Sequence, residues 1–193
     1  MTAGLGGEVA VRTFPLLTVS TPRLHVRPLS IADADAVTEI FADKQTQRWL
    51  PFPQEAGRIS GLAWCTELAA ERRDSGAGDH YGVVRREDDR LVGCLWVKRT
   101  DWLARVTEVS YAVAADARGF GIAAEAVDAL AIALVLEHGF QRVEVRVAAG
   151  NVASRRVTEK AGMTYEGLLR NAGVAHGGRV DLEIWSLVAA DLR

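Results

Sequence analysis

The chain of 193 residues has few cysteines and no metal-ligand spacing. Its two cysteines, Cys65 and Cys94, form no CxxC pair, and its four histidines stand in no HExxH arrangement. These absences argue against a disulfide framework, a zinc site and thiol redox chemistry. We therefore expect both cysteines to be small buried hydrophobic residues, and we expect no metal ion in the functional site.

The chain also lacks a large excess of charge and a long apolar run. It carries 23 Lys and Arg against 25 Asp and Glu, a formal net charge of -2, so no broad positive field favours nucleic acid. The most apolar stretch, residues 127–136, contains Asp128 and is about half as long as a bilayer requires. The first residues contain neither a basic cluster nor an apolar core typical of an export signal. We expect a cytoplasmic monomer or homodimer with no membrane or nucleic-acid partner.

The composition is that of a globular protein that builds its own core. Hydrophobic residues make up 49% of the chain and charged residues 25%, and we find no internal repeat and no low-complexity linker. A chain of this length usually forms one domain and needs no metal or disulfide to fold. The sequence predicts a loose leader over residues 1–20 and a single domain over residues 21–193.

The period of apolar residues predicts the elements of this domain. Expected strands cover residues 24–29, 81–86, 91–99, 105–114, 141–147, 165–169 and 180–187, and expected helices cover 33–42, 59–73, 119–138 and 151–161. Two prolines in the segment 47–53 argue against a helix there. The strands between residues 81 and 114 indicate an antiparallel meander, and the helix after them indicates a parallel crossover. The fold class is α/β or α+β, with a mixed central sheet that is antiparallel in its first half and flanked by helices.

The most informative segment joins an expected strand to the long helix. It reads Arg118-Gly119-Phe120-Gly121-Ile122-Ala123-Ala124. Glycines let backbone N–H groups approach an anion, and a helix N-terminus adds partial positive charge, so the segment is suited to phosphate, to which Arg118 adds a full charge. A plain turn between a strand and a helix would show the same glycines. The formal match to a dinucleotide fingerprint lacks the required context, because four residues precede the glycines and Glu144 falls in the middle of a strand.

The region from about Val92 to Met163 resembles the GNAT superfamily of acetyl-CoA-dependent N-acyltransferases. Its pyrophosphate loop has the pattern Q/R-x-x-G-x-G/A, which stands here as Arg118 to Ala123. Further matches are Glu108-Val-Ser-Tyr111 before the loop, Asn151-x-x-Ser154 opening the next helix and Glu159-Lys160-Ala-Gly162-Met163 closing it. An early Thr21-Pro-Arg23-Leu24-x-x-Arg27 and a late Asp181-x-x-x-Trp185-Ser186-Leu187 resemble the branch of ribosomal-protein N-terminal acetyltransferases of the Rim type. The resemblance covers residues 21–193.

The resemblance implies where acetyl-CoA binds. The backbone amides of Arg118, Gly119, Phe120, Gly121, Ile122 and Ala123 would hold the CoA pyrophosphate. The backbone of Val113 would hydrogen-bond the pantetheine arm, which the side chain of Asn151 would also meet. An Asn at this position also has a purely structural reading, as the N-cap of the helix that it begins. The two roles are compatible.

Acyl transfer to an amine needs a group that takes the amine proton and one that serves the leaving thiolate. Strand alternation places Glu108 on one face with Ser110 and Ala112, and related enzymes place a catalytic Glu on this strand, so we predict Glu108 as the general base, directly or through a water. Many relatives have a tyrosine acid where this chain has Thr158. Ser154 could donate to the cofactor sulfur, or it could merely support the helix N-terminus.

Three functions remain open from the sequence. The leading hypothesis is an acetyl-CoA-dependent N-acetyltransferase that acts on the α-amine of a protein or peptide N-terminus. The second is the same chemistry on a small amine such as an antibiotic, a polyamine or an amino acid. The third is an acyl-CoA-binding module without catalysis. Four tryptophans of the chain could wall an acceptor pocket, but large aromatic residues are more often core, and we assign them no role: Trp49, Trp64, Trp96 and Trp102.

Overall fold

The computed structural model describes residues 12–51, 58–175 and 177–192 of the chain. Its strands are β1 (Val19–Ser20), β2 (Leu24–Pro28), β3 (His80–Arg85), β4 (Arg90–Asp101), β5 (Val106–Val113), β6 (Arg142–Ala148), β7 (Thr164–Ala175) and β8 (Gly178–Leu187). Its α-helices are α1 (Ala34–Ala42), α2 (Lys44–Trp49), α3 (Arg58–Cys65), α4 (Glu67–Asp74), α5 (Ile122–Leu136) and α6 (Val152–Lys160). Short 3-10 turns cover Ile31–Asp33, Ala115–Ala117 and Ala189–Leu192.

All the strands join one mixed sheet in the order β1-β2-β3-β4-β5-β6-β8-β7. The first five strands are antiparallel neighbours, and β5 and β6 are parallel and joined by the crossover helix α5. The last hairpin folds back so that β8 lies between β6 and β7, antiparallel to both. The mixed sheet and its antiparallel first half confirm the predicted fold class.

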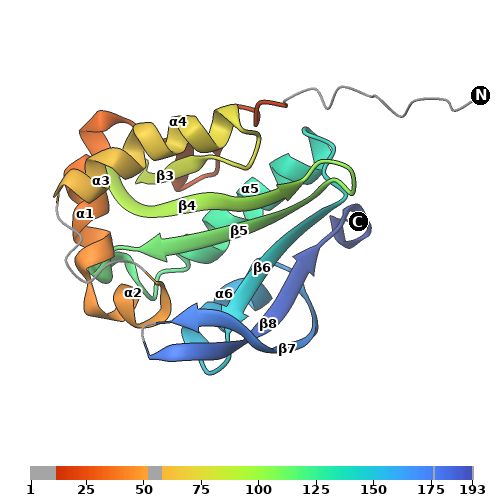
Figure 1. The fold of residues 1–193 in the computed structure, drawn as a ribbon. Helices are drawn as coiled ribbons and strands as arrows, with labels where there is room; N and C mark the ends of the chain where they lie inside the picture. Colours follow the sequence, from red (N-terminus) through yellow and green to blue (C-terminus); the bar gives the residue numbers. More distant parts are fainter. Residues whose placement is uncertain (1–11, 52–57, 176, 193) are drawn as a thin grey trace, which may run out of the picture.

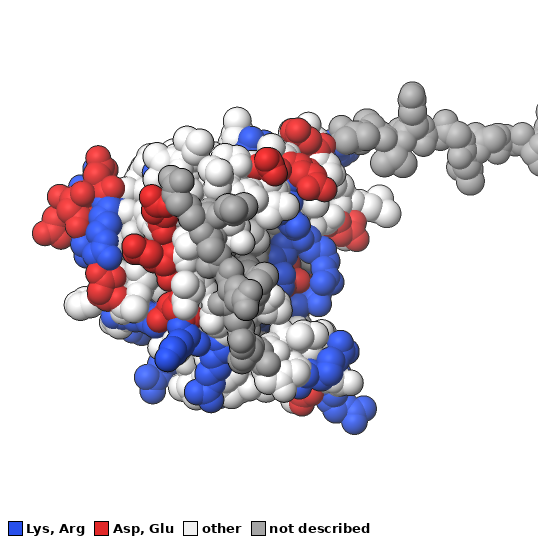
Figure 2. Space-filling view, turned by 60° about the vertical axis from the view of Figure 1, so that its left-hand side comes forward, with Lys and Arg blue, Asp and Glu red and all other residues white. Residues whose placement is uncertain are grey.

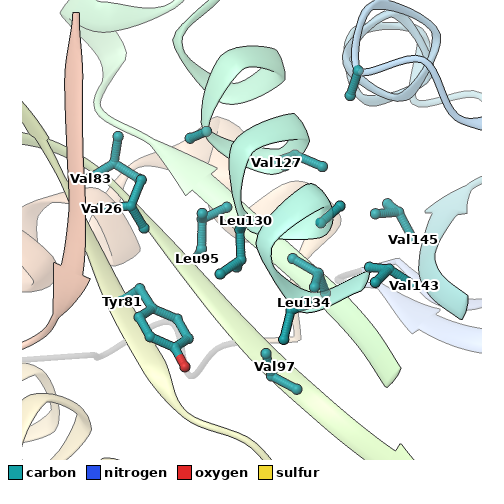
Figure 3. Packing of buried hydrophobic residues seen from close by; sticks show 14 of the residues in the cluster. Val26, Tyr81, Val83, Leu95, Val97, Val127, Leu130, Leu134, Val143 and Val145 are labelled. Atoms are coloured by element: carbon teal, nitrogen blue, oxygen red, sulfur yellow. The ribbon is translucent and has the colours of Figure 1, made fainter. Parts of the chain in front are cut away.

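The main core lies between the sheet and α5. Helix α5 is alanine- and leucine-rich and places Val127, Leu130 and Leu134 against Leu95 and Val97 of β4, all of them buried (Figure 3). Alternate residues of β4 point to the other face, where Cys94 and Trp96 join a second cluster with residues of α1 and α3. The first half of the sheet is therefore covered by helices on both faces (Figure 1).

The two cysteines behave as buried apolar side chains. Cys65 ends α3 and Cys94 lies in β4, and both are buried and form no disulfide. Burial raises the pKa of the Cys65 thiol to about 12 and also raises that of Cys94, because the charged thiolate is disfavoured away from water. The expectation of small buried residues is confirmed.

The helical region before β3 differs from the sequence prediction in two places. The expected helix over 59–73 is two helices, because Thr66 leaves the helical region with φ -122° and ψ -86° and separates α3 from α4. Residues 47–49, expected to be non-helical, belong to α2, which begins at an N-cap in which Asp43 Oδ1 accepts a hydrogen bond of 2.9 Å from the Thr46 amide. The helix ends at Trp49, before the first proline. The prolines therefore stop the helix from continuing but do not exclude a short helix before them.

Part of the expected leader is packed against the domain. Residues 12–20 lie within the described chain, and among them Phe14 and Leu17 are 1% and 3% exposed and belong to the main core. The Phe14 amide donates to the carbonyl of Arg73, 2.8 Å away, which fixes this segment beside α4. Residues 1–11 of the leader lie outside the described residues.

Candidate active site

The sheet opens between its two central strands. β5 and β6 pair only where Val106–Glu108 faces Arg142–Glu144. Beyond this point β5 stays with β4 as far as Val113, whereas β6 follows β8 to Ala148, so the two strands diverge (Figure 1). Backbone groups along a diverging strand lack a neighbouring strand on that side, and they are available to a ligand that enters the gap.

A cavity of about 400 Å³ occupies this opening. It has the size of a small-molecule site. Its lining brings together most of the predicted cofactor-binding residues, namely Val113, Arg118, Gly119, Gly121, Ile122, Ala123 and Asn151, and also the predicted Ser154. Phe120 is not among the lining residues and is 69% exposed, and Glu108 lies outside the lining, two residues from the lining residue Ser110 on β5.

The glycine loop has the geometry that its sequence requires. Gly119 and Gly121 have φ of 86° and 78°, in the left-handed region that favours glycine. The first hydrogen bond of α5 runs from the Glu125 amide to the Gly121 carbonyl, 3.0 Å, so the amides of the residues between them have no partner in the helix. These residues, Ile122, Ala123 and Ala124, line the cavity at the N-terminus of α5, and a helix N-terminus is suited to an anion.

The side chain of Arg118 serves the loop differently from the prediction. Instead of standing free for an anion, its guanidinium forms an ion pair with Asp43 at the start of α2. It also donates to the Val113 carbonyl (3.2 Å) and to Thr46 Oγ1 (3.2 Å). Burial disfavours the charged form of Asp43, but the hydrogen bonds from Arg118 and Thr46 outweigh it and lower the pKa of that carboxyl. Arg118 thus fastens the loop to α2.

Helix α6 presents its N-terminus to the middle of the cavity. The Asn151 side chain caps it, because Oδ1 accepts a hydrogen bond of 3.1 Å from the Ser154 amide. The Ser154 hydroxyl lies 2.6 Å from the hydroxyl of Tyr111, which comes from β5 and also lines the cavity. Thr158 is fully buried and donates to the Arg155 carbonyl inside the helix, so this position offers no acid to the cavity. Ser154 and Tyr111, whose hydroxyls are in contact, both line the cavity.

Glu108 lies where β5 and β6 part. Its side chain is 4% exposed and is approached by three cations: Lys98 Nζ at 3.0 Å from Oε1, and Arg146 Nε at 3.4 Å and Arg99 Nε at 3.9 Å from Oε2. No hydrogen bond reaches Oε2 within the described part of the chain. A buried carboxylate is tolerated when cations surround it, as Lys98, Arg146 and Arg99 do here.

Several charged residues at the site were given no role from the sequence. Arg146, Arg156 and Lys160 line the cavity and give it positive charge. Trp49 of α2, one of the four tryptophans considered for a pocket wall, lines it as well. Strand alternation would place Arg146 on the face of Glu144, but only the side-by-side pairing of β5 and β6 brings it to Glu108. Among the described residues, no group of three or more His, Cys, Asp or Glu could hold a metal ion, and none of the helices there is long and apolar enough to span a membrane.

Comparison with known families gives one match over most of the chain. Residues 23–164 match the model of the acetyltransferase (GNAT) domain. The matched region begins in the turn before β2 and ends at the first residue of β7, so it contains the glycine loop, the opening between β5 and β6, and α6.

Two relatives are similar to this chain in sequence and one solved structure is similar in fold. An uncharacterized N-acetyltransferase, p20, of Bacillus licheniformis is 25% identical over 179 residues, which cover 89% of this chain and 96% of p20. The putative ribosomal N-acetyltransferase YdaF of Bacillus subtilis is 27% identical over 170 residues, covering 86% of this chain and 91% of YdaF. The structure of Mycobacterium smegmatis RimJ in complex with CoA-disulfide superimposes with a TM-score of 0.80 at 23% identity, covering 92% of this chain and 88% of RimJ.

Proposed function

The chain belongs to the GNAT family of acetyltransferases, and we propose that it transfers the acetyl group of acetyl-CoA to the α-amine of a protein or peptide N-terminus. One observation carries the proposal. A single cavity is lined by the glycine loop, by Ser154 and by Ser110, which lies two residues along β5 from Glu108. An anion site, a proton donor and a proton acceptor for a phosphate-bearing thioester and an amine would thus lie at or next to one cavity.

The residues of the cavity fit the parts of acetyl-CoA. The amides from Gly119 to Ala123 would hold the pyrophosphate, and Arg156 and Lys160 would supply charge to the phosphates. The backbone of Val113 and the side chain of Asn151 would meet the pantetheine arm between the diverging strands. This assignment leaves the thioester beside Ser154 and Tyr111. The chemistry that acetyl-CoA supplies when bound is an activated acetyl group on sulfur.

We assign two residues to the proton transfers. Glu108 would take a proton from the amine as its nitrogen bonds to the acetyl carbon, directly or through one water. As the bond between that carbon and sulfur breaks, Ser154 would donate its hydroxyl proton to the leaving thiolate and regain one from Tyr111 or solvent. The place of Glu108 on β5, two residues from the lining residue Ser110, and the short contact between the two hydroxyls support these roles.

The choice of an α-amine rests on the cost of deprotonation. A peptide α-amine has a pKa of about 7.7 to 8.0 and a lysine side chain one of about 10.4. At pH 7 the neutral lysine amine therefore costs about 3 to 4 kcal/mol more than the neutral α-amine. A site with one carboxylate base is better matched to the α-amine. A small amine of similar basicity is the second candidate, because a cavity of about 400 Å³ would also admit one.

Release of free CoA thiol from acetyl-CoA, measured with a panel of N-terminal peptides and small amines, tests the proposal. Mass spectrometry of the products identifies the acetylated atom. Acetylation of a peptide α-amine is the expected result. Turnover with small amines alone would move the protein to the second candidate. Tight binding of acetyl-CoA without turnover of any acceptor would instead support a binding module without catalysis.

A further inference from the structure

Three cations surround Glu108, and one of them, Arg146, also lines the cavity. Lys98 and Arg99 come from β4 and Arg146 from β6, and we call these three residues the basic cluster. They meet around Glu108, at the point where β5 and β6 part. In Figure 2 a group of Lys and Arg side chains stands in the recess between the upper and lower parts of the molecule. The overall negative charge of the chain makes this local gathering of positive charge a feature to be explained.

The carboxylates nearby do not neutralise all of this positive charge. Four cations, the basic cluster and Arg142, face the three carboxylates of Glu108, Glu144 and Glu166, an excess of one positive charge. Arg142 is fully engaged, since it bonds to both Glu144 and Glu166. Arg99 is the opposite case. Its side chain is 66% exposed, and its approach to Glu108 at 3.9 Å is too long for a hydrogen bond.

Lys98 is also accessible from solvent. Its side chain is 46% exposed although its ammonium touches the buried Glu108, and its backbone is held because the Lys98 carbonyl accepts a hydrogen bond from Arg72. Two exposed cations on a fixed strand therefore stand beside the carboxylate at which the acceptor amine would lose its proton. An arginine with open donors is suited to a carboxylate or a phosphate.

We propose that the acceptor is an anionic amine, one that carries a carboxylate or phosphate close to its amino group, and that Arg99 and Lys98 bind this anion. The inference rests on the proposed function and names its substrate class. An α-amine followed by acidic residues is the form that fits the open recess best, because a chain can continue from it into solvent. A basic peptide or a polyamine would meet like charge.

The same cations would help the chemistry. An ammonium group beside three positive charges is destabilised relative to the neutral amine, and the neutral amine is the nucleophile. The basic cluster would not attract the amino group, but it would attract the negatively charged group of the same acceptor and so still bind it. The basic cluster would thus favour a negatively charged acceptor for binding and a neutral amino group for reaction.

Two matched sets of acceptors test the proposal. The first set is three peptides with the same first residue. In one it is followed by two acidic residues, in the second by two lysines and in the third by two neutral residues. The second is a dipeptide with a free terminal carboxylate and its terminal amide, which separates a peptide-borne anion from that of a small molecule. We expect kcat/KM for the acidic peptide to exceed that for the neutral one by about tenfold and to fall as salt rises.

The variants Arg99→Ala and Arg99→Glu locate the effect. Arg99→Ala should remove most of the preference for the acidic peptide, and Arg99→Glu should reverse it, while the affinity for acetyl-CoA is unchanged. The control is Arg85→Glu, which makes the same change of charge at the far end of the β3–β4 pair, where Arg85 faces Arg90. It should leave the preference intact.

The outcomes distinguish a failure of the anionic-acceptor proposal from a failure of the proposed function. Equal kcat/KM for acidic, neutral and basic acceptors, or a preference that Arg99→Glu does not alter, would overturn the anionic-acceptor proposal and leave acetyl transfer standing. If only the free dipeptide is acetylated, the anion site stands and the acceptor is a small molecule. If no acceptor of either charge releases CoA, the proposed function fails and this inference fails with it.

Discussion

Tyr111 Oη lies 2.6 Å from Ser154 Oγ, although the two residues are 43 positions apart in the sequence. The contact joins the strand that borders the cavity to the first turn of α6. Burial raises the pKa of Tyr111, against the smaller opposing effect of its hydrogen bond with Ser154, so the phenol stays protonated at neutral pH. It can therefore donate to Ser154 and fix the direction in which the serine hydroxyl points.

The variant Tyr111→Phe should lower kcat without weakening acetyl-CoA binding. Its ring still fills the space beside α6, but Ser154 loses its partner, and one neutral hydrogen bond corresponds to a change of about tenfold in rate. Ser154→Ala should cost more, about a hundredfold, as expected for loss of a proton donor. Steady-state kinetics with acetyl-CoA titrations would measure both effects.

A matched control is Tyr165→Phe, which removes a hydroxyl from a half-exposed tyrosine on β7. It should leave kcat unchanged. In a double-mutant cycle, Tyr111→Phe should have little further effect once Ser154 is alanine, because both act on the same proton donor. Fully additive losses would show that Tyr111 does not act through Ser154.

The variant Gly119→Ala should weaken acetyl-CoA binding more than it destabilises the fold. A Cβ at this position meets nothing within 4 Å, so the only conflict is the φ of 86°, which costs a non-glycine residue about 1 to 2 kcal/mol. The chain can relieve this strain by moving the loop, and that would misplace the amides that face the anion. Calorimetric titration with acetyl-CoA and thermal unfolding would separate affinity from stability.

Gly162→Ala provides the comparison. Gly162 follows α6, has φ of 66° and also has open space around its Cα, but it lies outside the cavity lining. We expect a similar loss of thermal stability with unchanged affinity for acetyl-CoA. Equal affinities in the two variants would contradict the role given to the glycine loop.

We expect the free energy of unfolding to decrease in mild acid because of the buried residue His80. It is 1% exposed, stacks on Trp64 with ring centroids 4.0 Å apart, and its Nδ1 lies 2.8 Å from the Trp64 carbonyl. Burial lowers its pKa from 6.5 to about 4. Below pH 6.5 this histidine is protonated in the unfolded chain, whereas in the folded chain it stays neutral down to about pH 4. The free energy of unfolding is therefore highest above pH 6.5 and falls by about 3 kcal/mol as the pH is lowered to about 4.

Urea unfolding at several pH values between 7 and 4 would measure this slope. His80→Asn should flatten it, whatever its effect on stability at pH 7. His138→Gln, at the partly exposed end of α5, should keep the slope of the original protein. An unchanged slope in His80→Asn would assign the acid sensitivity to other groups.

Local sequence patterns predicted most elements, because strand alternation, helical spacing and the glycines at helix ends are properties of neighbouring residues. The Asn151 cap and the glycine loop follow from such signals and appear as expected. The break at Thr66 lies within a continuous helical spacing, which gave no sign of it. The short helix α2 was missed because the prolines after it were given more weight than Asp43, whose side chain caps it. The place of β8 between β6 and β7 was likewise beyond local signals.

The site was less predictable than the fold, for a similar reason. The glycine loop could be located from the spacing of its own residues, whereas the role of Glu108 as a base was predicted only from the resemblance to the GNAT superfamily. The partners of those residues come from distant segments: Arg118 turns to Asp43, and Arg146 reaches Glu108 across the only parallel strand pair in the described sheet. No pattern within one segment encodes such contacts, because the order of strands in the sheet creates them.

The most direct test of acetyl transfer by this site is the turnover of Glu108→Gln beside that of Glu144→Gln. The two glutamates face each other across β5 and β6, so the variants make the same change on adjacent strands. We predict that Glu108→Gln lowers kcat by at least about a hundredfold while acetyl-CoA still binds, and that Glu144→Gln keeps most of the rate. A Glu108→Gln enzyme that acetylates peptides at the original rate, or a loss found only in Glu144→Gln, would contradict the account.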